Sequence, residues 1–114
     1  MSDHQSKYQL LKSLDKDSNL TQRQLSKKLS ISLGKVNYCL NSLIEKGFIK
    51  INNFKNSNNK IQYSYYLTPK GIEEKAKLTI SFLKVKTKEY EMLKKEFDKL
   101  TNFSSLGSSV FENK

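Results

Sequence analysis

From residue 21 onward, apolar residues recur among polar ones at the spacing of a short amphipathic helix. Thr21 followed by Gln24 is a capping box, in which each side chain satisfies an amide at a helix start, so a helix is predicted to begin at Thr21. Leu25 and Leu29 lie four residues apart on one face. The serines of residues 30–32 then interrupt the pattern, because serine favours turns and caps over helix interiors.

A second helix is predicted directly after this turn. Ser32 is its expected N-cap, and Gly47 is placed to end it. Its apolar residues recur mostly at spacings of three and four, which predicts one buried stripe consisting of Leu33, Val36, Leu40, Leu43 and Ile44. Two short helices joined by a tight polar turn are typical of a helix-turn-helix, in which the second helix reads DNA.

The polar face of this second helix carries groups that can read bases. Lys35 can donate to guanine or phosphate, and Asn37 and Asn41 can pair with adenine. Tyr38 offers an aromatic edge and a hydroxyl. If the helix is considered without its neighbours, the alternative is that these are ordinary polar side chains exposed to solvent. The expected contacts on this helix are Ser32, Gly34, Lys35, Asn37, Tyr38, Asn41 and Ser42.

Two segments with strand character follow. Residues 48–51 and 61–67 are rich in β-branched and aromatic side chains, so they are predicted to pair as a hairpin. The intervening residues 52–60 are polar, turn-prone and without acid. Such a loop is typical of the wing of a winged helix, in which Lys55 and Lys60 would contact the minor groove or the backbone. The alternative is a hairpin loop that contacts nothing.

The formal net charge of +10 is unevenly spread. Residues 18–70 contain nine cations and one acid, Glu45, whereas residues 73–98 contain seven lysines and six acids. A positive field concentrated on one module is the electrostatic footprint expected for phosphate binding. On the first helix of the pair, the expected phosphate contacts are Arg23, Lys27 and Lys28.

The two ends of the chain are predicted to add further helices. Near the N-terminus, Tyr8, Leu11 and Leu14 form a short apolar stripe that can cover the helix-turn-helix. Near the C-terminus a long helix is predicted to begin at Pro69, where the missing amide costs nothing in the first turn, and to run to about Leu100.

This long helix carries two apolar stripes, of which one could pack on its own domain. Burial of the other against a second copy, by coiled-coil-like packing, predicts a homodimer. The alternative is a monomer in which this long helix folds back on its own winged helix. A two-fold dimer could set two recognition helices about 34 Å apart, one turn of DNA. The expected dimer contacts are Ile80, Leu83, Tyr90, Leu93, Phe97 and Leu100.

The predicted fold class is therefore mainly α with a small β-hairpin, and the length of 114 residues allows one domain of ordinary size. A winged helix-turn-helix is expected over residues 5–70 and a C-terminal dimerisation helix over residues 68–100. Residues 101–114 are Ser-rich and aperiodic, so a flexible tail is expected there.

Several classes of protein are excluded by composition. The N-terminus lacks the regions of a signal peptide, and no apolar run approaches the roughly 18 residues of a membrane span, so a cytoplasmic chain without a membrane partner is expected. The single Cys39 excludes an internal disulfide, and a small, partly buried side chain is expected, with redox sensing as the alternative. His4 lies in a polar terminus that is expected to be mobile. Catalytic and phosphate-binding motifs are lacking, so no enzyme, cofactor or metal is expected.

The chain resembles MarR-like winged helix-turn-helix regulators, and it looks most like the small group associated with exopolysaccharide gene clusters. The resemblance covers about residues 5–100 and rests on the strings at residues 33–40, 43–48, 53–57 and 67–76. It implies a dimeric transcription regulator that acts at polysaccharide biosynthesis genes. It assigns no effector-binding residue, so a small-molecule effector is left open.

Two other functions compete with DNA reading. A winged helix could instead dock an acidic protein partner within a larger assembly. An RNA binder could use Tyr63, Tyr65 and Tyr66 as a stacking platform. Ile61, Tyr63, Tyr65 and Leu67 share a strand face, however, so most of these aromatic rings are expected to be core.

Overall fold

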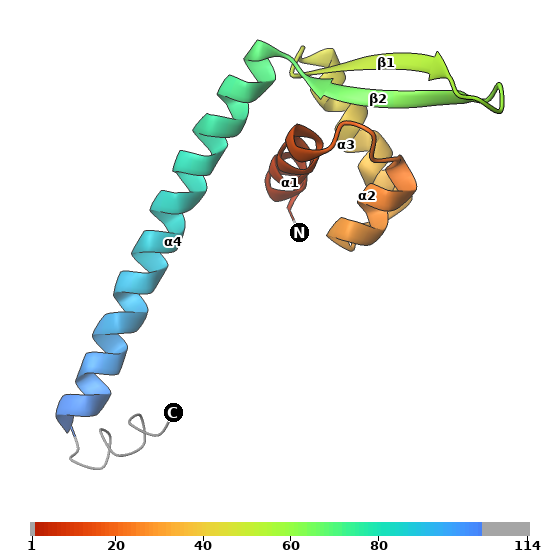
Figure 1. Cartoon of the computed structure of the whole chain (residues 1–114). Helices are drawn as coiled ribbons and strands as arrows, with labels where there is room; N and C mark the ends of the chain where they lie inside the picture. The colour runs from red at the N-terminus through yellow and green to blue at the C-terminus, as the bar shows by residue number, and fades with distance from the viewer. Residues whose placement is uncertain (1, 104–114) are drawn as a thin grey trace. The chain divides into compact units, whose positions relative to one another are not determined.

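The computed structural model describes residues 2–103 as four helices and one antiparallel hairpin (Figure 1). This arrangement confirms the predicted class, mainly α with a small β-hairpin. Two compact units are present, one ending at Thr79 and the other beginning at Ile80. In chain order the elements are α1 (Asp3–Lys16), α2 (Gln22–Leu29), α3 (Leu33–Glu45), β1 (Ile49–Lys55), β2 (Ile61–Leu67) and α4 (Pro69–Phe103).

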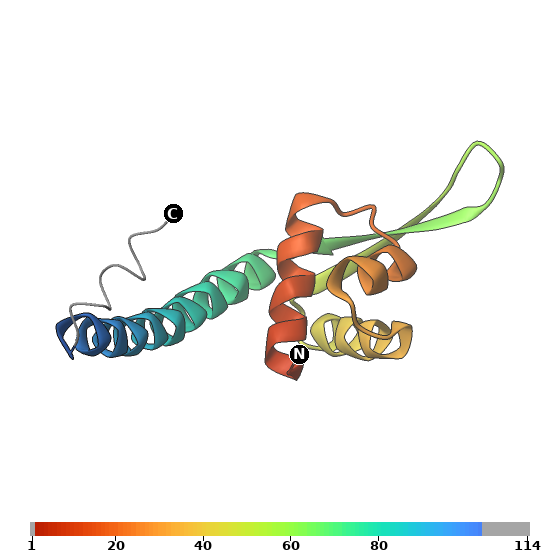
Figure 2. The ribbon, with the colours of Figure 1, turned by 90° about the horizontal axis from the view of Figure 1, so that it is seen from below.

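The core of the first unit lies between α1, α2, α3 and the base of the hairpin (Figure 2). Leu33, predicted as part of the buried stripe, is 41% exposed, because it begins α3 at the edge of the core. Tyr8 is half-buried, with its Oη 3.1 Å from Oγ1 of Thr79, and Leu10 is the fully buried residue that the predicted stripe lacked. The buried apolar residues are Leu10, Leu11, Leu14, Leu25, Val36, Cys39, Leu40, Leu43, Ile49, Tyr65 and Leu78.

Local caps begin the first two helices. Thr21 and Gln24 form the predicted capping box, in which the Gln24 amide donates to the Thr21 hydroxyl and the Thr21 amide donates to Gln24 Oε1. Ser2 and Gln5 form a second box, so α1 begins at Asp3. The expectation of a mobile terminus around His4 is therefore wrong, since the box places this histidine inside α1.

The hairpin is longer than the sequence predicted. Its register runs from Ile49 opposite Leu67 to Lys55 opposite Ile61, so β1 includes residues 52–55 of the polar segment interpreted as loop. Polar residues fit a strand here because β1 beyond Ile49 is exposed, and no alternating apolar pattern is required. The loop between β1 and β2 is therefore only residues 56–60. Within it, Asn59 adopts a left-handed conformation with φ 62°.

The segment between α1 and α2 runs along the outer edge of β2. The Tyr65 amide donates to the Ser18 carbonyl at 3.0 Å, and the Ser64 hydroxyl donates to the Asn19 side-chain oxygen at 2.8 Å. Both Ser64 and Tyr65 are buried. These contacts attach the base of the hairpin to the helical core.

The last helix begins as predicted and ends slightly later. Thr68 Oγ1 accepts the Gly71 amide at 3.0 Å, which caps the first turn. A Cβ at Gly71 would lie 2.0 Å from the Phe48 carbonyl oxygen, so only glycine allows this close approach. The helix extends three residues beyond Leu100, so residues 101–103 are helical and not tail, while residues 104–114 lie outside the described residues. None of the described helices is long and apolar enough to cross a membrane.

Candidate nucleic-acid interface

The turn between α2 and α3 is fixed by Ser26. Its carbonyl accepts the Ile31 amide at 3.2 Å, and its hydroxyl donates to the Ile31 carbonyl at 2.5 Å. Ser30 reverses the chain in a left-handed conformation, with φ 56°. Ser32 then caps α3, because its hydroxyl accepts the Lys35 amide at 3.1 Å. The two helices are thereby held as a helix-turn-helix.

The polar face predicted for the second helix is accessible on α3. Gly34, Asn37, Tyr38 and Asn41 are exposed, and Tyr38 retains 57% of its accessible surface. The N-cap Ser32 is exposed as well, whereas Lys35 and Ser42 are half-buried. A Cβ at Gly34 would have no neighbour within 4 Å, so this position leaves bare backbone near the start of the helix.

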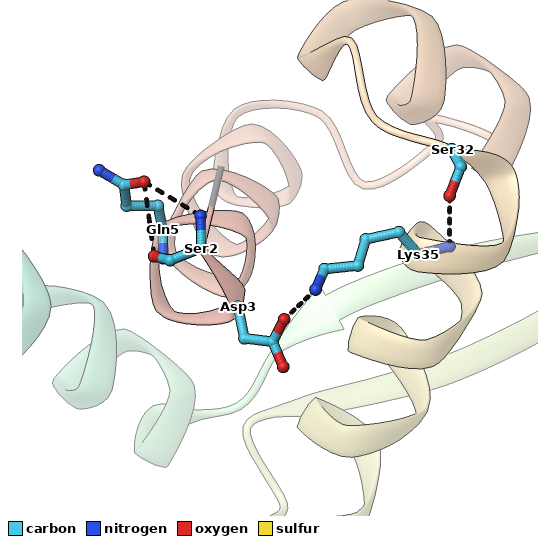
Figure 3. A network of polar contacts seen from close by, with 5 residues as sticks. All are labelled: Ser2, Asp3, Gln5, Ser32 and Lys35. Atoms are coloured by element: carbon cyan, nitrogen blue, oxygen red, sulfur yellow. Dashed lines mark hydrogen bonds and ion pairs between the residues drawn. The ribbon is translucent and has the colours of Figure 1, made fainter.

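Lys35 is engaged by an acid that the sequence did not indicate. Its ammonium forms an ion pair with Asp3 at the start of α1 (Figure 3). The same ammonium lies 5.9 Å from the centre of the Tyr38 ring. Asp3 is 32 residues away in the sequence, so no local pattern pointed to it. Contact between Lys35 and DNA stays a prediction, and it would require this ion pair to open or be shared.

A chain of side-chain hydrogen bonds, here called the amide relay, joins α3 to α2 and β2. Asn41 Nδ2 donates to Asn37 Oδ1 at 3.2 Å, and Asn37 Nδ2 donates to Gln22 Oε1 at 3.4 Å. Gln22 Nε2 in turn donates to the Tyr65 hydroxyl at 3.2 Å. The spacing of four residues between the two asparagines predicted that they share a face. Gln22 and Tyr65 were missed, since their contact joins positions 43 residues apart.

The three cations predicted on α2 are exposed but do not lie together. Arg23 and Lys27 line a hollow of about 250 Å³ that also includes Leu33, at the start of α3. Lys28 lines a separate hollow of about 270 Å³ between α1 and α2. There it is accompanied by Lys12 and Lys16, two lysines of α1 that were absent from the predicted set. Two α2 cations thus flank the start of α3, and the third belongs to a different basic patch.

The wing tip is an ordered turn with cations on both sides. Asn56 Oδ1 accepts the amides of Asn58 and Lys60 at 2.9 and 3.0 Å. Lys55, the last residue of β1, is exposed, as is Lys60 in the turn. The predicted cations of the wing are therefore accessible, although Lys55 lies in a strand and not in the loop.

Much of the apolar surface of the wing is exposed, contrary to expectation. On the face expected to be core, Tyr65 is 6% exposed and Leu67 is half-buried, but Ile61 and Tyr63 are 58% and 52% exposed. The base of the hairpin is covered by the helices, whereas its outer half extends beyond them (Figure 2). Tyr63 and Tyr66 lie on opposite faces of β2, because side chains alternate along a strand. They do not form the single stacking platform considered for RNA.

The remaining predicted positions are the dimer contacts on α4 and the single cysteine. The six residues proposed for dimerisation are exposed on α4, from 42% for Phe97 to 70% for Leu93. Cys39 is fully buried and not partly buried as expected, because it faces the core side of α3. Among residues 2–103, no cluster of His, Cys, Asp and Glu could hold a metal ion.

Comparison with known proteins identifies the fold. Residues 3–50 match a family model described as "Winged helix-turn-helix DNA-binding". A PadR-like transcriptional regulator from Bacillus cereus aligns with a TM-score of 0.68 and 20% identity, over 76% of this chain and 89% of that one. MepR of Staphylococcus aureus, a transcription regulator of the multidrug efflux pump MepA, aligns with a TM-score of 0.60 and 20% identity, over 92% and 78%.

A variant of ZitR from Lactococcus lactis aligns with a TM-score of 0.63 and 22% identity, over 93% of this chain and 73% of that one. No curated protein matches the chain significantly in sequence. The chain therefore has a winged helix-turn-helix fold, which it shares with these transcriptional regulators.

Proposed function

We propose that this chain is a cytoplasmic, sequence-specific regulator of transcription that binds double-stranded DNA as a homodimer. The observation that carries the proposal is the accessible polar face of α3, held by a rigid turn beside an ordered wing. In this arrangement α3 enters the major groove, and Asn37, Tyr38 and Asn41 reach base edges. The resemblance drawn from the sequence supports polysaccharide biosynthesis genes as the targets.

Backbone contacts are assigned to the cations around α3. Arg23 and Lys27 flank its first turn, and Lys55 and Lys60 lie at the wing tip. Each of these side chains is exposed and can release a counterion on meeting a phosphate. Because such contacts are independent of sequence, they supply affinity and orientation, while the base contacts of α3 supply the choice of site.

Dimerisation is assigned to the exposed apolar residues of α4. Leu83, Tyr90, Leu93 and Leu100 are each more than half exposed, and they follow one another at spacings of seven, three and seven. Large apolar surfaces of this kind mark sites of association. Pairing of two α4 helices would bury them and would present two copies of α3 to one duplex.

Selection of bound duplexes from a random pool tests the proposal most directly. We expect an enriched palindrome whose half-sites are about 10 base pairs apart, one turn of DNA. Each of Lys55→Ala and Lys60→Ala should weaken binding to all duplexes and lower the slope of log affinity against log salt by about one unit. Lys88→Ala, in the nearly neutral segment of residues 73–98, is the matched control and should leave the slope unchanged.

A protein-docking function is the second candidate, favoured by the exposed apolar residues of the wing. Ile51, Phe54, Ile61 and Tyr63 are 44–58% exposed, which is more apolar surface than contact with phosphates requires. If the chain shows no preference for any duplex over random DNA or heparin, this function replaces the proposed one.

A further inference from the structure

The amide relay determines how Asn41 presents its remaining polar groups to a base. A side-chain amide has two N–H donors and one carbonyl acceptor. Asn41 uses one N–H on Asn37, and among residues 2–103 its carbonyl oxygen and second N–H have no partner. One donor beside one acceptor matches the N7 acceptor and N6 donor of adenine in the major groove.

A paired contact of this kind depends on how the Asn41 amide is held. Its oxygen and its remaining N–H must both meet the edge of the adenine, which requires one orientation of the amide plane. The hydrogen bond to Asn37 restricts the rotation of this amide.

The far end of the relay is the fixed end. Tyr65 is 6% exposed, and its amide also donates to the Ser18 carbonyl, so its hydroxyl is held in one place. Gln22 is half-buried and follows directly after the capped Thr21 at the start of α2. Its Nε2 donates to this hydroxyl, which leaves Oε1 turned toward Asn37.

From these contacts we infer that Gln22 and Tyr65 are positioning residues, which hold Asn37 and Asn41 in the orientation that reads adenine. The inference rests on the proposed DNA-binding function. Neither residue needs to touch DNA, because each acts through the hydrogen bond that it makes to the next amide. Loss of the Tyr65 hydroxyl would leave the Gln22 Nε2 donor unpaired, and the Gln22 side chain would no longer be held in place beside Asn37.

The test compares the base preference of Gln22→Ala and Tyr65→Phe with that of the wild type. Affinities are measured for the selected duplex and for versions in which each adenine of the half-site is replaced by guanine. We expect the wild type to prefer adenine at one position by about 5- to 150-fold, the range of a bidentate contact. In both variants this ratio should fall to about twofold or less, while the salt slope and the affinity for random duplex stay unchanged.

Two controls separate positioning from structural damage. Gln9→Ala on α1 and Tyr66→Phe on β2 make the same chemical changes outside the relay and should preserve the adenine preference. In an Asn41→Ala background, Gln22→Ala should have no further effect on that position. An equal loss on every duplex, or a Gln22→Ala effect that persists without Asn41, would overturn the inference.

The outcomes for this inference and for the proposed function are distinct. A wild type without any sequence preference refutes the DNA-reading function and the inference that rests on it. A wild type that prefers one palindrome, with the preference unaltered in Gln22→Ala and Tyr65→Phe, refutes the relay alone. Thermal unfolding of each variant confirms that it is folded before binding is measured.

Discussion

Lys35 on the recognition helix α3 is ion-paired with Asp3, the first residue of α1 (Figure 3). The carboxylate and the ammonium retain 53% and 29% of their side-chain accessible surface, so the pair lies at the surface. It places a negative charge on the face proposed to meet DNA and competes for a cation predicted to contact it. We therefore expect Asp3 to lower the affinity of this surface for DNA.

Replacement of Asp3 by asparagine should strengthen binding to DNA. The ion pair is exposed, and exposed pairs contribute about 0.2–1 kcal/mol, which corresponds to a gain of up to about fivefold once Lys35 is released. Fluorescence anisotropy with a labelled duplex at low salt measures the change. In a Lys35→Ala background the gain should shrink, and an equal gain there would mean that Asp3 acts by general repulsion of phosphate.

A charge within the exposed apolar stripe of α4 should dissociate the dimer. Leu83 and Leu93 are 63% and 70% exposed, and a glutamate at either position would be buried without a partner on pairing. Leu83→Glu and Leu93→Glu should sediment as monomers at concentrations where the wild type is dimeric. Lys88→Glu changes charge on the same helix away from the stripe and should remain dimeric. A wild type that is monomeric at high concentration contradicts the coiled pairing.

Two glycines should respond in opposite directions to the same substitution. Gly71→Ala places a methyl group against the Phe48 carbonyl oxygen and should destabilise the fold by about 1–3 kcal/mol or more. Gly34→Ala meets open space inside a helix and should stabilise it by up to about 1 kcal/mol, since alanine is the better helix former. Chemical denaturation measures both. If α3 approaches DNA closely, Gly34→Ala should also weaken binding despite its greater stability.

Removal of the Asn56 side chain should loosen the wing tip. Its oxygen accepts two backbone amides of the turn, each worth about 0.5–1.5 kcal/mol net. In Asn56→Ala, amide hydrogen exchange at residues 58 and 60 should accelerate. Binding to all duplexes should weaken, because a disordered tip must be ordered on contact. Asn58→Ala, which leaves both bonds to Asn56 in place, should behave as wild type.

The thiol of Cys39 should be unreactive in the folded protein. Its side chain is fully buried in the core side of α3, so a thiol reagent cannot reach it without unfolding. Reaction with a chromogenic disulfide should be slow in native buffer and complete in denaturant. Rapid native labelling would restore the redox-sensing alternative.

Local chemistry explains which parts of the fold could be predicted from the sequence. The Thr21 capping box, the Ser32 cap and the helix stop at Gly47 each depend on neighbours within four residues, so the pattern of the chain was sufficient. The length of β1 was not predictable in this way. Its exposed polar residues carry no alternation, and the tertiary position of the hairpin leaves most of them in solvent.

Long-range contacts explain what was missed at the candidate site. The exposed face of α3 followed from helical periodicity, but the partners of Lys35 and Asn37 are Asp3 and Gln22, 32 and 15 residues away. A single sequence does not show which distant side chains meet. The exposure of Ile61 was missed for the same reason, since strand alternation predicts a shared face but not how far the helices cover it.

The attachment of Ser18 and Asn19 to β2 has a consequence for solubility. A hairpin with open edges is a template for another chain to add a strand, and exposed apolar side chains beside such an edge increase the hazard. At the base of the wing, the Ser18 carbonyl already occupies the Tyr65 amide on the outer edge of β2. An intruding strand cannot use that edge there, so the chain resists one route to aggregation while its wing stays exposed.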